Sequence, residues 1–370
     1  MKWSDGYRKR LAVVGFVTAI LVGDGSAKAD FTFGDPTNLG PPINTEAGEV
    51  PCGISPDGLE FYFIDAYALR PGNLGGHDIW ISRRSSISES WGEPENLGPP
   101  INTEYDDAMP SLSKDGLTLY FSSKRPGGHG KSDLYVSTRV GLGENWGEPV
   151  LLDPTVNGPS GDSYPFISAD GLALYFSSNR EGGYGGVDTW VATRATSDDD
   201  WGEPVNLGPE INSPDYDSSP FLSPDGRRLF FHSLRTGGLG AADVWVVTRP
   251  SLIDPWGLPI PLSVPINSEF ADAAARISSD GTTLYYSSNR PGGVGDLDIL
   301  QAPIIPIVDL NGDGIVDADD MCIVVDHWGE NYSLCDIGPM PWGDGIVDVQ
   351  DLVVLAEHLF EEFRLDEAVE

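Results

Sequence analysis

Residues 146–194 read WGEPVLLDPTVNGPSGDSYPFISADGLALYFSSNREGGYGGVDTWVATR, and this stretch decides the fold. Its strand-forming segments are Trp146–Leu152, Tyr164–Ser168, Ala173–Ser178 and Thr189–Arg194. Asp170-Gly171 joins the second segment to the third, and this dipeptide is typical of a tight hairpin turn. A glycine-rich loop, Arg180–Gly186, leads into the last segment. The stretch therefore predicts one small sheet of four antiparallel strands.

This unit is repeated along the chain at a period of 55 residues. The repeated positions are Trp91, Trp146, Trp201 and Trp256; Asp78, Asp133, Asp188, Asp243 and Asp298; and Arg70, Arg125, Arg180, Arg235 and Arg290. The first unit is three residues longer, near Asp65–Tyr67. A four-stranded unit repeated radially is a propeller blade. The fold class is therefore all-β, a five-bladed β-propeller with four strands per blade.

The ends of the repeat predict how the ring closes. Trp256–Leu262 completes the blade before it, so the fifth blade lacks one strand. Residues 31–39 supply that strand, because Phe33-Gly34-Asp35-Pro36 matches Trp91-Gly92-Glu93-Pro94. Apolar runs such as Leu174-Tyr175-Phe176 require cover on both faces, which neighbouring blades provide. We expect a monomeric propeller over residues 30–305 with no exposed sheet edge.

The repeats resemble the WD-repeat-like propeller repeats of the TolB type. The resemblance rests on Ser223-Pro224-Asp225-Gly226, on Leu229-Phe230-Phe231, and on Arg235-Thr236-Gly237-Gly238 leading to Asp243-Val244-Trp245. It covers roughly residues 33–303. It implies a propeller that serves as an interaction module, and in some proteins of this type such a module lies beside a catalytic domain.

The repeated carboxylates predict structure and not catalysis. Acid–base chemistry on a sugar needs two carboxylates in different environments, whereas five equivalent aspartates share one environment. The aspartate of each Asp-Gly turn bonds its own turn backbone. The aspartate before each last strand either accepts amide bonds from the glycine loop or pairs with the loop arginine. A ligand site must break the five-fold symmetry, and His129 and Tyr184 in the glycine loops are candidates.

The pattern changes after Ile307. Side-chain oxygens of Asp309, Asn311, Asp313, Asp317 and Asp320 fall at positions 1, 3, 5, 9 and 12 of one loop, and the carbonyl of Ile315 falls at position 7. This spacing wraps six oxygen ligands around one calcium ion. A second loop places Asp344, the Ile346 carbonyl, Asp348 and Asp351 at positions 5, 7, 9 and 12. Its positions 1 and 3 are Met340 and Trp342, so Asp336 is the candidate replacement if residues 337–341 bulge out. A helix is expected after each loop.

These paired loops resemble a type I dockerin over roughly residues 306–363. The resemblance implies two calcium ions and a cohesin-like or cell-envelope partner. It departs from the family at loop positions 10 and 11, often Ser-Thr, which here are Ala318-Asp319 and Val349-Gln350. Cys322 and Cys335 lie in the same module, so we predict a disulfide between them. Cys52 is interpreted as a small buried residue.

The N-terminus has the pattern of a signal peptide over residues 1–29. Arg8-Lys9-Arg10 precede the apolar segment Leu11–Val22, and Ala27-Lys28-Ala29 gives a cleavage site after Ala29. No other apolar stretch approaches the twenty residues of a membrane span, so we expect secretion without membrane insertion. The net charge of −35 excludes nucleic acid and anionic lipid surfaces as partners. Residues 364–370 form an acidic tail.

Taken together, these features predict a secreted binding or scaffolding protein. The propeller presents a face to a glycan or a protein, and the C-terminal module docks it to an extracellular partner. The alternative is a glycoside hydrolase, or an accessory protein, that takes part in polysaccharide breakdown. An asymmetric pair of carboxylates in one cleft would favour the enzyme.

Overall fold

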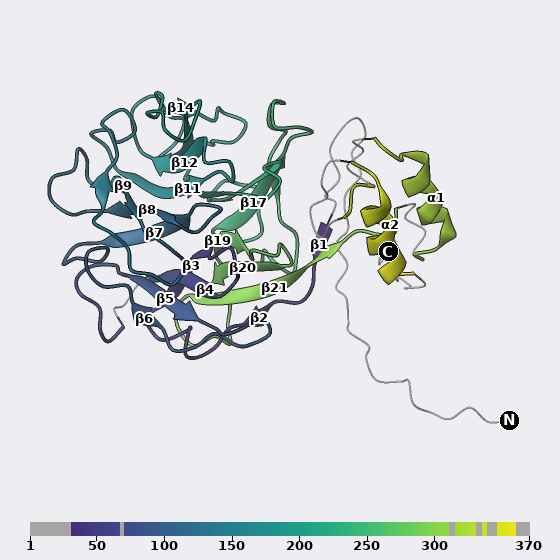
Figure 1. Ribbon diagram of the computed structural model, residues 1–370, viewed down its shortest axis with the longest axis horizontal. Helices are drawn as coiled ribbons and strands as arrows, with labels where there is room; N and C mark the ends of the chain where they lie inside the picture. Colours follow the sequence, from purple (N-terminus) through teal and green to yellow (C-terminus); the bar gives the residue numbers. More distant parts are fainter. Residues whose placement is uncertain (1–30, 67–69, 311–314, 331–334, 339–345, 360–370) are drawn as a thin grey trace.

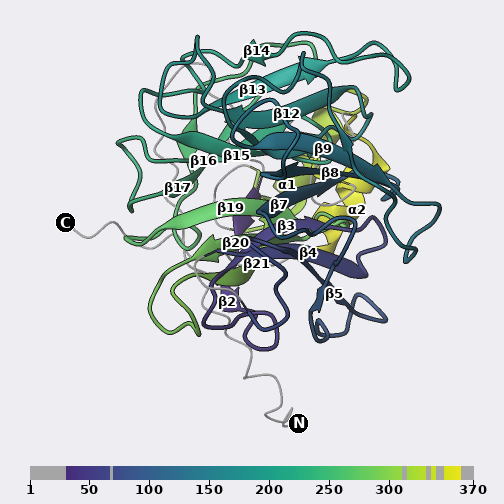
Figure 2. The same ribbon diagram turned by 90° about the vertical axis from the view of Figure 1, so that its left-hand side faces the viewer.

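The computed structural model describes residues 31–66, 70–310, 315–330, 335–338 and 346–359. Five antiparallel sheets, each with four strands from the repeat, surround a common centre (Figure 1). Figure 2 views the propeller face-on. The blades follow one another in chain order around the centre, and the two helices lie behind them. The predicted five-bladed propeller with four strands per blade is confirmed.

The strands follow one another from the innermost to the outermost in blades one to four. Blade one holds β3 (Glu49–Ile54), β4 (Glu60–Asp65), β5 (Ile79–Arg83) and β6 (Glu95–Asn96). Blade two holds β7 (Asp107–Leu112), β8 (Thr118–Ser123), β9 (Asp133–Thr138) and β10 (Val150–Leu151). Blade three holds β11 (Asp162–Ile167), β12 (Ala173–Ser178), β13 (Asp188–Thr193) and β14 (Val205–Asn206). Blade four holds β15 (Asp217–Leu222), β16 (Arg228–Ser233), β17 (Asp243–Thr248) and β18 (Ile260–Pro261). Blade five holds β19 (Asp272–Ile277), β20 (Thr283–Ser288), β21 (Asp298–Pro306) and β2 (Thr37–Asn38).

The outermost strands are shorter than the sequence predicts. In blade two the predicted strand Trp146–Leu152 is reduced to Val150–Leu151. Pro149 has no N–H to donate to a sheet, and Trp146 lies instead beneath the guanidinium of Arg139, 4.5 Å from its ring centre. The tryptophan therefore covers the end of the blade, and the strand begins after the proline.

The N-terminal segment closes the ring, as predicted. β2 pairs antiparallel with β21 through Thr37–Gln301 and Asn38–Leu300. Before it, β1 (Phe31–Phe33) pairs with the far end of β21, at Ile304–Pro306. The predicted strand 31–39 is thus two short strands, which are separated at Gly34 to Pro36. Together they cover the edge that blade five would otherwise expose.

The core lies between adjacent blades. Phe121, Phe176 and Phe231 from the second strands are at most 1% exposed, as the apolar runs on both strand faces require. Each Asp-Gly turn lies between the first and second strands, and each glycine loop lies between the second and third. Because adjacent strands are antiparallel, all the turns lie on one face of the ring and all the glycine loops on the other.

β21 leads into a small helical module beside the ring, next to β1 (Figure 1). Its helices are α1 (Ala318–Asp326) and α2 (Val349–Glu357), and each begins with a capping box, at Asp317 and Asp348. The two helices share one core, which includes Val316, Val324, Val347 and Leu355. The helices expected after the two loops are present. Neither helix, at nine residues, has the length to cross a membrane, and the described residues contain no other helix.

Deleting residues 31–39 should open the ring. β21 would then expose unpaired backbone groups along an edge that is apolar on both faces, which favours edge-to-edge association. We expect aggregation in size-exclusion chromatography and loss of a single cooperative transition in calorimetry. Deletion of residues 364–370 is the control. A monomeric, cooperatively unfolding protein without residues 31–39 would contradict the closure.

Candidate functional site

The aspartates of the Asp-Gly turns are structural. In blade three, Asp170 Oδ1 accepts hydrogen bonds from Ser168 Oγ at 2.5 Å and from the Leu172 backbone N–H at 3.0 Å. The same two bonds are made in the other blades by Asp57, Asp115, Asp225 and Asp280. The predicted bonding of each aspartate to its own turn is confirmed.

The aspartates before the last long strand of each blade bind the glycine loop. Asp188 accepts the amides of Tyr184 and Gly185 at 2.5 and 3.0 Å. Equivalent bonds are made by Asp78, Asp133, Asp243 and Asp298. Of the two alternatives left open by the sequence, the amide bonds are the ones present.

The loop arginine pairs with a different carboxylate, one that the sequence analysis did not single out. Arg180 Nη2 lies 2.6 Å from Asp162 Oδ1, at the start of the innermost strand, and 2.6 Å from the Val156 carbonyl oxygen. Its Nε donates to Ser178 Oγ at 3.0 Å. The equivalent pairs are Arg125–Asp107, Arg235–Asp217 and Arg290–Asp272. These aspartates also recur every 55 residues, which is the signal that would have found them.

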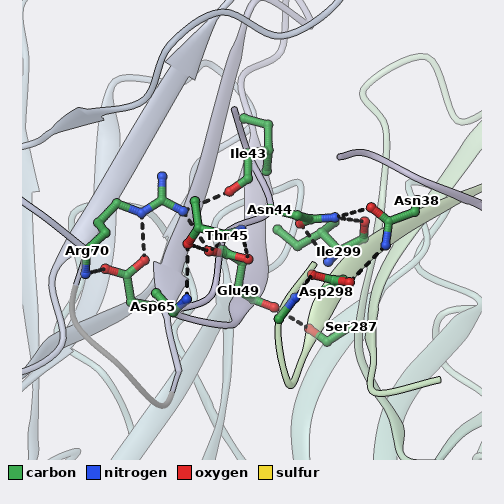
Figure 3. A network of polar contacts seen from close by, with 12 residues as sticks. Asn38, Ile43, Asn44, Thr45, Glu49, Asp65, Arg70, Ser287, Asp298 and Ile299 are labelled. Atoms are coloured by element: carbon green, nitrogen blue, oxygen red, sulfur yellow. Dashed lines mark hydrogen bonds and ion pairs between the residues drawn. The ribbon is translucent and has the colours of Figure 1, made fainter. Parts of the chain in front are cut away.

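Blade one departs from this pattern by carrying an extra carboxylate. Arg70 binds Glu49 at 2.8 Å and Asp65 at 2.9 Å, and both acids are fully buried (Figure 3). The other four blades have serine in place of Asp65. Desolvation outweighs the arginine and raises the pKa of Glu49 to about 7, and burial also raises the pKa of Asp65. Two acids therefore share one buried cation.

A pocket of about 510 Å³ opens where blade five meets blade one. Four segments line it: residues 38–43, the loop 84–91 after β5, the turn of blade five with the start of β20, and Gln301 in β21. Its polar groups include Arg84, Glu89 and Asp280, with hydroxyls from several serines and threonines. Trp91 lies under Arg84, 4.1 Å from its guanidinium carbon. The size is typical of a small-molecule site, and the lining includes the Asp-Gly turn of blade five.

Gln301, in β21, is the side chain that makes this pocket different from the repeat. The equivalent positions in the other four blades are aliphatic: Ile81, Val136, Val191 and Val246. Within the described part of the chain, the Gln301 amide makes no side-chain hydrogen bond, and it lines the pocket. The sequence analysis compared only the glycine loops and so missed this difference between repeats.

Arg276 is a second departure that the sequence analysis missed. The other innermost strands have Gly53, Ser111, Phe166 and Phe221 at its position. Arg276 is 3% exposed, and burial lowers its pKa. Its Nε donates to the Cys52 carbonyl of blade one at 2.8 Å, and its Nη1 donates to Ser219 Oγ of blade four at 3.3 Å. It thus ties three innermost strands together.

The predicted rim residues lie on the other face. The backbone amides of His129 and Tyr184 bind Asp133 and Asp188, and both side chains are exposed. They lie on the glycine loops of blades two and three, whereas the pocket is built around an Asp-Gly turn. The structure therefore does not bring them to the pocket, and their role in binding a ligand stays a prediction.

Asp320 binds the described residues on both sides of the first predicted calcium loop. This fully buried carboxylate accepts the amides of Leu310 at 2.7 Å and Asp317 at 2.9 Å, which lie at opposite ends of the loop. The Ile315 side chain is 44% exposed, and the role of its carbonyl as a calcium ligand stays a prediction. Asn311 and Asp313 lie outside the described residues. The donors present are hard oxygens, which fit calcium.

The second loop has the same arrangement around Asp351. Its carboxylate accepts the amides of Ile337, Gly338 and Asp348 at 2.6, 2.7 and 2.6 Å. Burial raises the pKa of Asp351. The Ile346 side chain is 53% exposed, like its counterpart in the first loop. Asp344 lies outside the described residues, and among those that are described, no three His, Cys, Asp or Glu side chains are grouped to hold a metal.

The three cysteines are free thiols in the structure. Cys322 is exposed and Cys335 is buried, with its Sγ 3.8 Å from the carbonyl oxygen of Ile323. The bridge between them stays a prediction. Cys52 is buried, and desolvation raises its pKa to about 12, so it is a packing residue and not a reactive thiol.

Comparison with known proteins assigns neither a family nor a function to this chain. No protein-family model matches the chain, and no curated protein matches it. Among solved structures, TolB from Acinetobacter baumannii is 17% identical over 71% of this chain, with a TM-score of 0.42. The chain spans about half of that protein, 54% of its length.

Glycoside hydrolases also match. A thermostable family-43 glycoside hydrolase is 16% identical, with 73% of this chain and 93% of that chain covered and a TM-score of 0.48. The catalytic domain of a Coprinopsis cinerea GH62 alpha-L-arabinofuranosidase is 13% identical, with 74% and 97% covered and a TM-score of 0.49. At these identities and TM-scores the similarity does not bear on what this chain binds. The dockerin-like resemblance stays a prediction.

Replacing Asp65 with serine, the residue of the other four blades, should stabilise the protein at neutral pH. Burial raises the pKa of the Asp65 carboxyl above its unfolded-state value of 3.8, so this group contributes stability at low pH that is lost as pH rises through its folded-state pKa. Wild type should therefore lose more stability than Asp65→Ser between pH 5 and pH 8, because wild type must ionise a second carboxyl beside Arg70. Calorimetric Tm values at pH 5 and pH 8 measure this.

The converse variant is Ser123→Asp in blade two, which places the second acid beside Arg125. It should introduce the same loss of Tm at pH 8. Equal pH dependence in wild type and Asp65→Ser would show that the two acids do not compete for Arg70.

Proposed function

We propose that this chain is a secreted binding protein that holds a glycan in the pocket between blades five and one. The C-terminal module would bind calcium and dock the propeller to a protein partner. The pocket at the seam, with a Gln301 amide that has no side-chain hydrogen bond to the described residues, is the observation that carries the proposal.

The chemistry of the pocket favours a polyhydroxylated ligand. Sugar hydroxyls both donate and accept, and the lining offers donors from Arg84 and Gln301 and acceptors from Glu89 and the hydroxyl side chains. Trp91 and Tyr285 also line the pocket, but both rings are buried, and Trp91 lies between Arg84 and Phe61. The 510 Å³ volume leaves room for one or two sugar rings.

The repeated carboxylates do not support a hydrolase. In every blade the aspartates of the turns, the glycine loops and the innermost strands are held by amides, hydroxyls or arginine. Asp280, which lines the pocket, has the same bonds as its four equivalents, and these bonds lower its pKa. A proton donor near neutral pH needs the opposite shift.

Calcium would be held in the first loop by Asp309, Asp317, Asp320 and the Ile315 carbonyl, with Asn311 and Asp313. Asp336, Asp344, Asp348, Asp351 and the Ile346 carbonyl would hold a second ion. When bound, the ions neutralise carboxylates that otherwise repel one another in a core too small to fold on apolar burial alone. A cohesin-like or cell-envelope protein is the proposed partner.

Gln301→Val should abolish glycan binding without unfolding the blade, because valine is the residue at this position in three other blades. The mature chain is screened on a glycan array, and hits are measured by calorimetric titration. We expect at least a tenfold loss of affinity, since an unmet sugar hydroxyl in a pocket costs about 1–3 kcal/mol.

Thr138→Val, at the exposed end of β9, is the matched control and should bind as wild type does. Equal glycan affinity of the two variants would show that the pocket is not the glycan-binding site. Reducing-sugar release by wild type that Gln301→Val abolishes would make the site catalytic and overturn the binding role.

Asp309→Asn should weaken calcium binding at the first loop by at least tenfold in the full chain, because a charged ligand at position 1 is lost. Titration after removal of calcium by a chelator measures the affinity. Asp319→Asn is the control, since Asp319 is an exposed acid of the same helical turn and is not a proposed ligand. If both variants bind as wild type does, Asp309 is not a ligand.

A further inference from the structure

The two calcium loops begin at equivalent residues in space. The amide of Leu310 donates to Asp320 Oδ1 at 2.7 Å, and the amide of Ile337 donates to Asp351 Oδ1 at 2.6 Å. Both Leu310 and Ile337 are buried in the core of the module. The residue before each of them therefore holds the same place, so Asp336 corresponds to Asp309.

If Asp351 is taken as position 12 and the loop is counted back along the sequence, position 1 falls on Met340 and not on Asp336. The second loop is four residues longer than the first between its opening aspartate and its last ligand. The extra residues fall after Gly338, which still donates to Asp351 at 2.7 Å. The backbone amides therefore identify the start of the loop, although the sequence spacing does not.

Asp336 also contacts the propeller. Arg227 Nη1, in the Asp-Gly turn of blade four, lies 3.4 Å from Asp336 Oδ2. The Asp336 side chain is 1% exposed and that of Arg227 is 16% exposed, so the pair is largely shielded from water. A buried carboxylate needs a cation or several hydrogen-bond donors beside it.

Arg227 is a departure from the repeat. The equivalent turn residues of the other blades are Leu59, Leu117, Leu172 and Thr282, and none of these is charged. The only blade with a cation at this position is the one whose turn touches the module. The repeat does not require this arginine for the turn itself, because the turn uses its backbone: the amide donates to Asp225 and the carbonyl accepts from the Arg249 amide.

We propose that Asp336 is the first ligand of the second calcium site and that Arg227 of the propeller competes with calcium for it. This inference rests on the proposed calcium binding. A divalent ion on Asp336 would repel the guanidinium, so the ion pair and the metal do not coexist at full strength. The propeller thereby sets the calcium affinity of the second loop. By linkage, calcium in that loop weakens the contact between the module and blade four by the same factor.

The test isolates the second loop in the full chain by using the Asp309→Asn background. Calcium affinity is measured by calorimetric titration after chelator treatment. Adding Arg227→Leu should raise the affinity of the remaining site about three- to tenfold, because it removes the competing charge. Leucine is the residue of blades one to three, so the turn should fold. Arg227→Lys should keep the affinity near that of the background.

The matched control is Lys131→Leu, which removes the same charge from an exposed glycine loop on the opposite face of the ring. Asp336→Asn should abolish the remaining site. Equal affinities of the Arg227→Leu and Lys131→Leu proteins would overturn the competition, and an unaffected Asp336→Asn protein would overturn the ligand assignment. A wild-type chain that binds no calcium would overturn the proposed function and this inference together. A wild-type chain that binds calcium, with Arg227→Leu unchanged, overturns only the inference.

Discussion

Every blade depends on an arginine that reaches back from the glycine loop to the start of the innermost strand. In blades two to five, the arginine meets an aspartate, a backbone carbonyl and a serine hydroxyl at once, as Arg180 does. Such a pair stabilises only when its hydrogen bonds are complete, because an uncompensated buried charge costs several kcal/mol. The arginine and its three partners therefore hold three segments of each blade together. It also occupies the carboxylates that a reader of the sequence would first consider for catalysis.

Functional features are consequently found where the repeat is broken. The residues that differ from their equivalents in the other blades lie at the seam between blades five and one, and at the turn of blade four. Gln301 replaces an aliphatic residue at the seam pocket, and Arg276 replaces a smaller or apolar residue at the ring centre. Arg227 replaces leucine or threonine where the helical module touches the ring. All three lie close to the place where both ends of the propeller chain meet.

The sequence predicted what the period determines and missed what depends on contacts between distant segments. Blade number, turns and ring closure follow from residues that recur every 55 positions. The partner of Arg180 was missed because Asp162 is 18 residues away, whereas Asp188 is nearer in sequence. The pocket was missed because its lining comes from four segments that only the closed ring brings together. The place of Asp336 was left open because an insertion shifts the count, whereas the amide of Ile337 bound to Asp351 supports our inference that Asp336 matches Asp309.

The closing strand gives the propeller a particular order of assembly. Thr37 pairs with Gln301, 264 residues further along the chain. A growing polypeptide makes β2 first and must wait for nearly the whole propeller before its partner exists. Blades one to four each contain all their own strands and form from local segments, whereas blade five pays the entropy of joining the two ends. A chain interrupted between the end of blade four, at Pro261, and residue 300 would thus retain four complete blades and an unpaired N-terminal strand, so premature termination there yields a fragment prone to association and not a smaller propeller.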